Sequence, residues 1–276
     1  MAVAAILVGL IVGGFVTMVV DRAPDRTALS LRSRCPHCEN RLRVVDSIPV
    51  YSWFALRKRC RHCSVPITGA YPVVEVVTAV LFTLVVLRFD DGWVLLPPLI
   101  LVTSLMALSV IDLYVYRLPD VVMGPSIAVS LVAIVAVSLA VDREGAIARS
   151  IVGGLLYFGI LLVAHLISPR GMGFGDVKLA MLLGLHLGWV AGTFYLGWTP
   201  VLRLVVYALV LGSVVGVVVG VAVAVLRRRV GARVLPDPEA QGDQPRRLLG
   251  QSFPFGPALA AGTLFAVLFS ETLLGA

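Results

Sequence analysis

Eight long apolar stretches limit how this chain can fold, because each is about as long as a helix that crosses a membrane. Such a helix needs about 20 mostly apolar residues. Stretches of this kind lie at 2–20, 72–88, 93–111, 121–140, 150–167, 177–197, 203–226 and 255–274. Hydrophobic residues make up 59% of the chain and charged residues 14%, which excludes an ordinary soluble domain. The sequence therefore predicts an all-α polytopic membrane protein with about eight transmembrane helices.

The distribution of positive charge predicts the orientation of these helices. With the N-terminus outside, 19 of the 23 Lys and Arg residues fall in inner loops or just within an inner helix end. No basic residue precedes the first stretch, so we expect 1–20 to be an uncleaved first transmembrane helix rather than a secretory signal. The asymmetry also explains the net charge of +7, and no basic–aromatic stripe accompanies it. We therefore expect the lipid bilayer, and no nucleic acid, as a partner.

Two inner loops are long and differ in composition. Residues 21–71 carry all four cysteines, and we interpret them as a small folded cytoplasmic domain. Residues 231–252 are rich in Pro, Gln and Gly, a composition typical of disorder. The remaining core is expected to run over 72–276, with the disordered loop inside it.

The cysteines form two pairs, "CPHC" at 35–38 and "CRHC" at 60–63. Two C-x-x-C turns at this separation can give four thiolates the tetrahedral arrangement that zinc prefers. The sequence thus predicts a closed structural zinc site at Cys35, Cys38, Cys60 and Cys63. Redox-active thiols, or a cluster without metal, are the alternatives. A disulfide is not expected on the cytoplasmic side, where thiols stay reduced.

Two acids stand at the ends of apolar stretches. Asp112 lies at the inner end of the third stretch and Asp176 begins the sixth, and a charge in a membrane span is costly. Two spans separate them, so both must lie at the same membrane face, which is also the face of the cysteines. Two neighbouring carboxyl groups would share a proton and could hydrolyse a peptide, as aspartic proteases do. The alternative is that each acid caps a helix.

Several motifs together resemble the prepilin peptidases, also called type IV leader peptidases. "GFGDVKLAMLLG" at 173–184 is similar to the family's G-x-G-D motif, and "DLYVYRLPD" at 112–120 is similar to its other acidic motif. The resemblance continues, in order, through "GLIVGGFVTMVVDRAP", the paired cysteines, "IPVYSWFALRKRCRHC", "YPVVE" and "PFGPALAAG". It departs from the family at Glu39 and Ser64, where glycine commonly follows each cysteine pair.

The resemblance implies a membrane-embedded aspartic endopeptidase whose catalytic pair is Asp112 and Asp176. Asp120 matches a supporting position outside that pair. Members remove the leader peptide of type IV prepilins and pseudopilins at the cytoplasmic face of the bacterial plasma membrane. Members with four cysteines also methylate the new N-terminus with S-adenosylmethionine. A proton-coupled or metal transporter and a non-catalytic pilus-assembly scaffold are the rival functions.

Five further residues receive expected roles beside the catalytic pair. Gly173 and Gly175 are expected to shape the loop before Asp176 by allowing close backbone approach and unusual dihedral angles. Lys178 is either an electrostatic neighbour of the acids or one more inner positive charge. Glu75 is either a third functional acid or a helix-end residue. His186, in the sixth stretch, is expected to form a hydrogen bond between helices.

Overall fold

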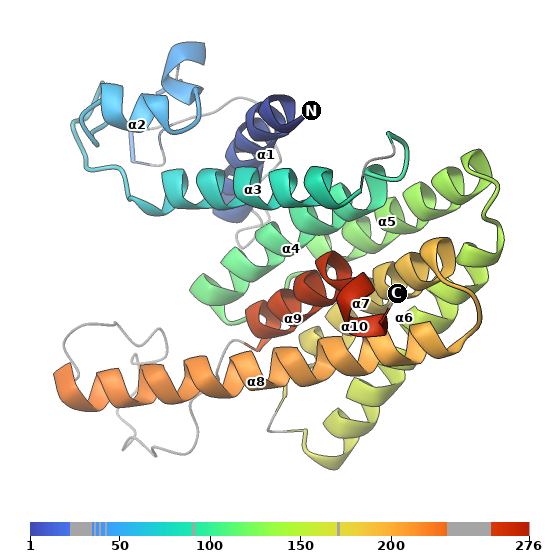
Figure 1. The fold of residues 1–276 in the computed structure, drawn as a ribbon. Coiled ribbons are helices and arrows are strands. Elements are labelled where there is room, and N and C mark those ends of the chain that lie inside the picture. Colours follow the sequence, from blue (N-terminus) through green and yellow to red (C-terminus); the bar gives the residue numbers. More distant parts are fainter. Residues whose placement is uncertain are drawn as a thin grey trace. The chain divides into compact units, whose positions relative to one another are not determined.

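Helices make up the regular structure of the described chain. The computed structural model describes residues 1–22, 35, 37–38, 40–41, 43–89, 92–169, 172–230 and 255–275. Over these residues, seven helices are long and apolar enough to cross a membrane. They are α1 (Ala2–Arg22), α3 (Ala70–Arg88), α4 (Leu96–Val115), α5 (Asp120–Ala140), α6 (Gly145–Ile167), α7 (Phe174–Phe194) and α8 (Thr199–Val230) (Figure 1). They correspond to the first seven expected stretches.

The eighth expected stretch is broken into two short helices. Helix α9 covers Gly256–Leu268, only 13 residues, and α10 covers Ser270–Leu274. A helix of 13 residues is about 20 Å long, which is less than the hydrocarbon thickness of about 30 Å. The stretch therefore differs from the single long helix that its hydropathy predicts, because Phe269 separates α9 from α10.

The predicted domain boundaries remain predictions. Between the first two long helices, the structure describes a short 3-10 helix, η1 (Val44–Ser47), and α2 (Tyr51–Ala55). The segment 231–252, expected to be disordered, lies outside the described residues. Contacts group the chain into two compact units. Unit 1 is Met1–Val110 with Pro119–Asp142, and unit 2 is Ile111–Leu118 with Arg143–Ala276.

In unit 1, small residues allow α1 and α3 to touch along their backbones. A Cβ on Gly9 would lie 2.6 Å from Cα of Ala79, and one on Gly13 would lie 2.6 Å from Cα of Glu75. Both distances are too short for a side chain. Residues four apart lie on one face of a helix, so these two glycines form a flat surface against which α3 packs.

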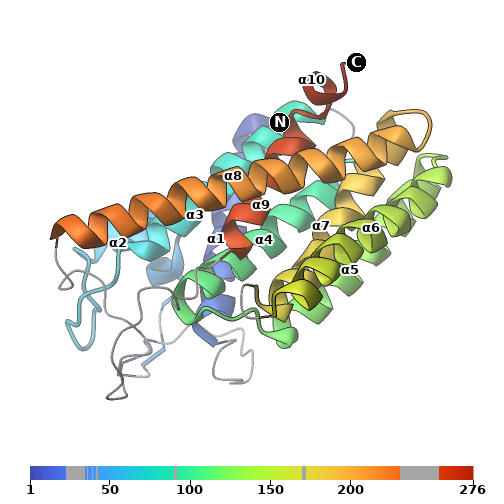
Figure 2. The ribbon, with the colours of Figure 1, turned by 90° about the horizontal axis from the view of Figure 1, so that it is seen from below.

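Unit 2 is built around α7. Of the 18 most apolar consecutive residues of α7, 83% are buried, compared with 28% of those of α6 and of α8. Gly184 lies so close to the carbonyl group of Gly153 that no side-chain carbon would fit, and Gly188 is equally close to the carbonyl group of Arg149. Close contact between small residues is the ordinary means by which helices associate in lipid. Figure 2 shows α6 beside α7, and α8 beside α9.

Candidate active site

Asp112 is held in the last turn of α4, in unit 2. Its side chain is buried, and Oδ2 has no hydrogen-bond partner among the described residues. The N–H of Tyr116 donates to the Asp112 carbonyl oxygen at 2.9 Å, and Tyr116 adopts a left-handed conformation with φ of 54°. A left-handed residue commonly ends a helix, although glycine usually occupies this position. Tyr116 therefore ends α4 sharply, directly after the turn that carries Asp112.

Asp176 lies in the first turn of α7 and is also buried. Helix α7 begins after Gly173, whose carbonyl oxygen accepts a hydrogen bond from the Asp176 N–H at 3.1 Å. In return, the backbone N–H of Gly173 donates to the Asp176 carboxylate. The contact of the Asp176 carboxylate with the Gly173 N–H resembles one half of a capping box, because the glycine has no side chain to supply the other half. This contact fixes the direction of the carboxyl group.

The two carboxyl groups meet at Gly256, the first residue of α9. A Cβ added to Gly256 would lie 2.8 Å from Oδ2 of Asp112 and 3.6 Å from Oδ1 of Asp176. Both acids thus face the small space beside this glycine, and the Gly256 backbone amide lies next to the Asp112 carboxyl group. The N-terminus of α9 carries partial positive charge, which stabilises negative charge on the acids. Helix caps alone do not require the two acids to converge, but a catalytic pair does.

The predicted glycines contribute by size rather than by dihedral angle. Gly175 packs against Leu118, because a Cβ added there would lie 3.1 Å from Cβ of Leu118. This contact holds the chain that follows Asp112 against the start of α7. Gly173 has φ of −68° and ψ of 145°, which any residue adopts. The expected close approach is therefore present at Gly175, whereas the expected unusual dihedral angle at Gly173 is wrong.

The structure shows the surroundings of three other predicted site residues, whose roles stay predictions. Asp120 begins α5, is exposed, and belongs to unit 1. Lys178 is half-buried, with Nζ 5.3 Å from the centre of the Phe174 ring. Glu75, in unit 1, accepts a hydrogen bond of 2.6 Å from the N–H of Val50.

His186 is buried in α7. Its Nδ1 lies 2.9 Å from the carbonyl oxygen of Leu182, one turn earlier in the same helix. This bond lies within α7, because buried helical side chains readily reach the carbonyl group four residues before them. The expected hydrogen bond between helices stays a prediction.

The four cysteines gather into one cluster in unit 1. Their sulfur atoms all lie within 4.8 Å of one another, and Sγ of Cys35 is 3.8 Å from Sγ of Cys63. In a tetrahedral zinc site with Zn–S bonds of about 2.3 Å, neighbouring sulfurs are about 3.8 Å apart. Backbone N–H groups of Cys63 and His62 lower the pKa of the Cys60 thiol to about 6, which favours the thiolate that a metal needs. The cluster therefore fits a zinc ion.

Two features that support the second cysteine pair were not evident from the sequence. Ser64 has φ of 58°, and its N–H donates to the carbonyl oxygen of Cys60 at 3.0 Å. Glycine adopts such a left-handed turn at a lower cost than serine does. Asp46 is buried and forms a 2.6 Å ion pair with Arg61, whose guanidinium holds the pKa of that carboxyl group below its usual range. The pair fixes the turn between Cys60 and Cys63 onto η1.

Comparison with known proteins places these features in a family. The model of the bacterial Peptidase A24 N-terminal domain matches residues 7–89, and that of the type IV leader peptidase family matches residues 99–221. The prepilin leader peptidase/N-methyltransferase of Pseudomonas putida is 31% identical, over 98% of this chain and 91% of the relative. The chain belongs to the type IV leader peptidase family.

Other members of the type IV leader peptidase family differ in how much of their length is matched. The protein of the same name from Bacillus subtilis strain 168 is 26% identical, over 96% of this chain and 93% of the relative. The prepilin leader peptidase/N-methyltransferase of Aeromonas hydrophila is 33% identical, over 62% of this chain and 59% of the relative. No solved structure matches the chain. The two acids lie inside the region that the family model matches, whereas Gly256 lies beyond it.

Proposed function

We propose that the chain is a membrane-embedded aspartic endopeptidase with Asp112 and Asp176 as its catalytic residues. The observation that carries this proposal is the convergence of two buried carboxyl groups on the space beside Gly256. Two such groups cannot both ionise cheaply, so they share one proton. The ionised carboxylate removes a proton from a water molecule, and the oxygen of that water attacks the peptide carbonyl carbon. The protonated partner donates its proton to the carbonyl oxygen. The carboxyl group that took the proton from water then passes it to the amide nitrogen, a hydroxyl group of the intermediate returns a proton to the partner, and the C–N bond breaks to release the amine and a new carboxyl group.

The substrates we propose are type IV prepilins and pseudopilins, such as those of type II secretion systems. The relatives are named prepilin leader peptidases, and this family resemblance implies cleavage just before a long apolar helix. Asp112 lies in the last turn of α4 and Asp176 in the first turn of α7, so both acids lie at helix ends. They can therefore meet a peptide bond at the membrane edge. The bias of Lys and Arg favours the cytoplasmic face of the bacterial plasma membrane, with the N-terminus outside.

We further propose a structural zinc ion bound by Cys35, Cys38, Cys60 and Cys63. The spacing of the sulfurs supports it, and four thiolates leave no open position for a catalytic water. The ion would link the two C-x-x-C turns, and the Asp46–Arg61 pair would hold the second turn in position. The peptidase reaction requires no metal in this scheme, because a carboxylate activates the water.

The zinc proposal predicts one zinc ion per chain, measured by elemental analysis after purification without added metal. Cys60→Ser should lose the ion, because it removes one ligand of a closed site. The loss should increase proteolytic cleavage within residues 21–71. Ser64→Gly is the matched control, since it changes the same turn but removes no ligand and relieves a left-handed serine. Metal-free native protein with four freely titrating thiols would contradict the proposal.

The second activity we propose is N-methylation of the new N-terminus with S-adenosylmethionine as donor. The names of the relatives support it, because they include N-methyltransferase. The described residues form no β-strands and so contain no strand–loop–helix unit of the kind that commonly holds a nucleotide. We therefore assign no residue to the donor and derive no step through it.

Cleavage and methylation should separate in one experiment. Purified protein is incubated with a candidate prepilin, with and without S-adenosylmethionine, and the products are weighed by mass spectrometry. We expect loss of the leader in both samples and the added mass of one CH₂ group only with the donor. Asp176→Asn should leave the precursor intact and unmethylated, yet should still methylate a pre-cleaved pilin. Cleavage without methylation would overturn only the second activity, whereas no cleavage would favour the transporter or the scaffold.

A further inference from the structure

The residues just before α2 (Tyr51–Ala55) lie against the sides of α1 and α3 rather than beyond the ends of these helices. The N–H of Val50 donates to Oε2 of Glu75, the sixth residue of α3. A Cβ on Gly14 would lie 3.7 Å from Cγ of Pro49, and Gly14 is eight residues before the end of α1. With a rise of 1.5 Å per residue, these contacts lie about 7 to 12 Å inward of the two helix ends. The loop before α2 therefore reaches the level at which a bilayer begins.

Helix α2, which follows this loop, exposes aromatic side chains. Tyr51 is 58% exposed and Phe54 is 63% exposed, and Ile48 immediately before the helix is also exposed. Trp53 anchors the helix from the other side, since its Nε1 donates to the carbonyl oxygen of Ile67 at 3.2 Å. Exposed Tyr and Phe side chains at this level match the aromatic belts that lie at membrane–water interfaces.

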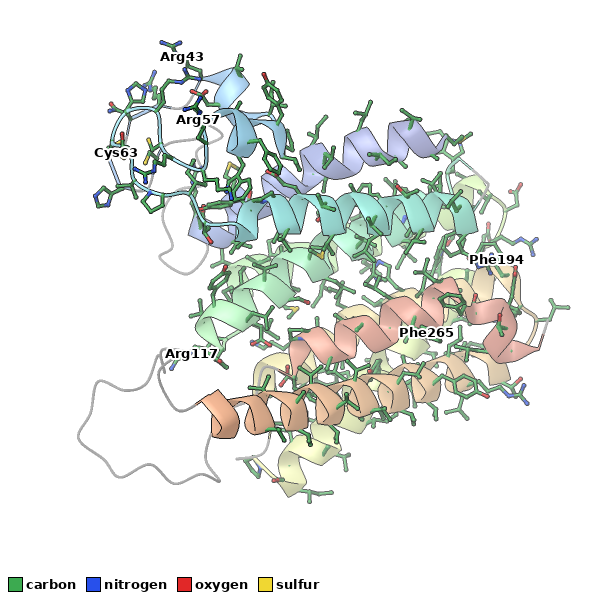
Figure 3. The ribbon with its side chains drawn as sticks, turned by 60° about the vertical axis from the view of Figure 1, so that its left-hand side comes forward. Arg43, Arg57, Cys63, Arg117, Phe194 and Phe265 are labelled. Atoms are coloured by element: carbon green, nitrogen blue, oxygen red, sulfur yellow. The ribbon has the colours of Figure 1, made fainter. Side chains whose placement is uncertain are left out.

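Basic side chains follow the aromatic ones directly. Arg57, Lys58 and Arg59 are all exposed, and Nζ of Lys58 lies 4.7 Å from the centre of the Trp53 ring. Figure 3 shows Arg43 and Arg57 in the same part of the chain as Cys63. Across residues 43–69 the sequence contains one acid, Asp46, which is buried and paired. The surface thus combines apolar area with positive charge, and residues 43–69 contain no exposed carboxylate.

The backbone around this surface is held in conformations that are costly for its residues. Val50 has φ of 60°, an outlier for a β-branched residue, and Glu75 fixes it through the hydrogen bond to its N–H. Arg57 and Lys58 have φ of 50° and 62°. Their N–H groups donate to the backbone carbonyl oxygens of Phe54 and Trp53 at the C-terminal end of α2. Such conformations persist only where the surrounding structure enforces them. The aromatic and basic groups are therefore presented in a fixed arrangement.

We infer that the surface formed by Ile48, Tyr51, Phe54, Arg57, Lys58 and Arg59 docks onto anionic phospholipid in the leaflet where α3 begins. The apolar side chains insert between headgroups, and the three cations contact their phosphate groups. Charge complementarity favours this partner over a basic peptide. The role of Glu75 is then to hold the loop at the depth of the headgroups, as a positioning residue. The inference is independent of the proposed peptidase activity.

Hydrogen exchange of the full chain in lipid nanodiscs tests the inference. Backbone amides of residues 51–59 are compared in discs of phosphatidylcholine alone and in discs that also contain phosphatidylglycerol. We expect slower exchange with phosphatidylglycerol, and the difference should shrink as salt is added. Replacing Arg57, Lys58 and Arg59 together by Gln should remove the difference in exchange between the two lipids. Each charge removed should lower the protection factor by about fivefold. Unchanged exchange of residues 60–69 verifies that the segment remains folded.

Two controls make the outcome decisive. A variant with Gln at Arg88, Arg143 and Arg203 loses the same charge elsewhere and should keep the lipid effect. Inorganic phosphate added to phosphatidylcholine discs should not protect residues 51–59. Equal exchange in the two lipids, or a lipid effect that survives the triple substitution at 57–59, would overturn the inference. Protection by inorganic phosphate would show a free-anion site and would overturn it as well.

Discussion

Asp112→Asn and Asp176→Asn should each reduce leader cleavage by about a thousandfold or more, while the protein still inserts and accumulates. Asparagine has nearly the shape of aspartate, but it can neither accept the proton of water nor donate one to the carbonyl oxygen. Both carboxyl groups are buried, so losing one removes a costly potential charge and should not unfold the chain. Cleavage of a prepilin, followed by gel shift and mass spectrometry, measures the loss.

The pattern across variants distinguishes a catalytic pair from two helix caps. The double variant should be no less active than either single one, because groups that act as a unit are lost together. Asp120→Asn is the matched control, since the same change falls on an exposed residue of unit 1 and should retain most activity. Thermal unfolding of all variants should be similar. Near-normal turnover in either Asp112→Asn or Asp176→Asn would refute the assignment.

The long helices were predictable because membrane-spanning segments must satisfy their own backbone hydrogen bonds and present apolar side chains. Those two requirements leave a signal in every one of the seven stretches. The same signal gave one long helix at 255–274, but the apolar part of this stretch ends at Phe269, and Ser270, Glu271 and Thr272 follow it in α10. Hydropathy measures how well a stretch tolerates lipid, whereas the length of α9 depends on the helices that surround it. A short buried helix and a spanning one can therefore look alike in sequence.

The acids of the site were predictable for a different reason. A carboxylate at the end of an apolar stretch is costly, so Asp112 and Asp176 stand out, and counting spans places them at one membrane face. Gly256 gives no such signal, because its role depends on three elements meeting in space. Tyr116 likewise reads as an ordinary aromatic residue, yet its left-handed conformation ends α4 beside Asp112. The cost of placing a charged residue in an apolar stretch can be recognised from neighbouring residues in the sequence. Close contact between distant segments cannot.

The cysteine cluster shows the same division. The C-x-x-C spacing predicts four sulfurs around one point, because each pair forms a local turn. The Asp46–Arg61 pair joins residues 15 apart, and nothing in the sequence distinguishes this acid from an exposed one. Its contribution became apparent only from its burial and its short contact. Reasoning from the sequence thus finds the ligands, while their supporting residues require the structure.

The second large effect is expected from Gly256→Ala, which should reduce cleavage by about a hundredfold. The new methyl group would lie 2.8 Å from Oδ2 of Asp112, which is closer than real Cβ atoms approach other atoms. Either the carboxyl group must rotate or α9 must move away, and both changes disturb the pair. The methyl group would also fill the space that both acids face, where the water and the peptide bond would react.

Two matched glycine substitutions make this result interpretable. Gly159→Ala adds the same methyl group to a helix of unit 2, but nothing lies within 4 Å of it, so activity should be unchanged. Gly175→Ala would meet only the Leu118 side chain at 3.1 Å, which can shift by a few tenths of an ångström, so its loss should be intermediate. Activity is compared with thermal unfolding in the same preparations. If Gly256→Ala cleaves as fast as Gly159→Ala while remaining folded, the reacting peptide does not occupy the space beside Gly256, and the acids must work from their other sides.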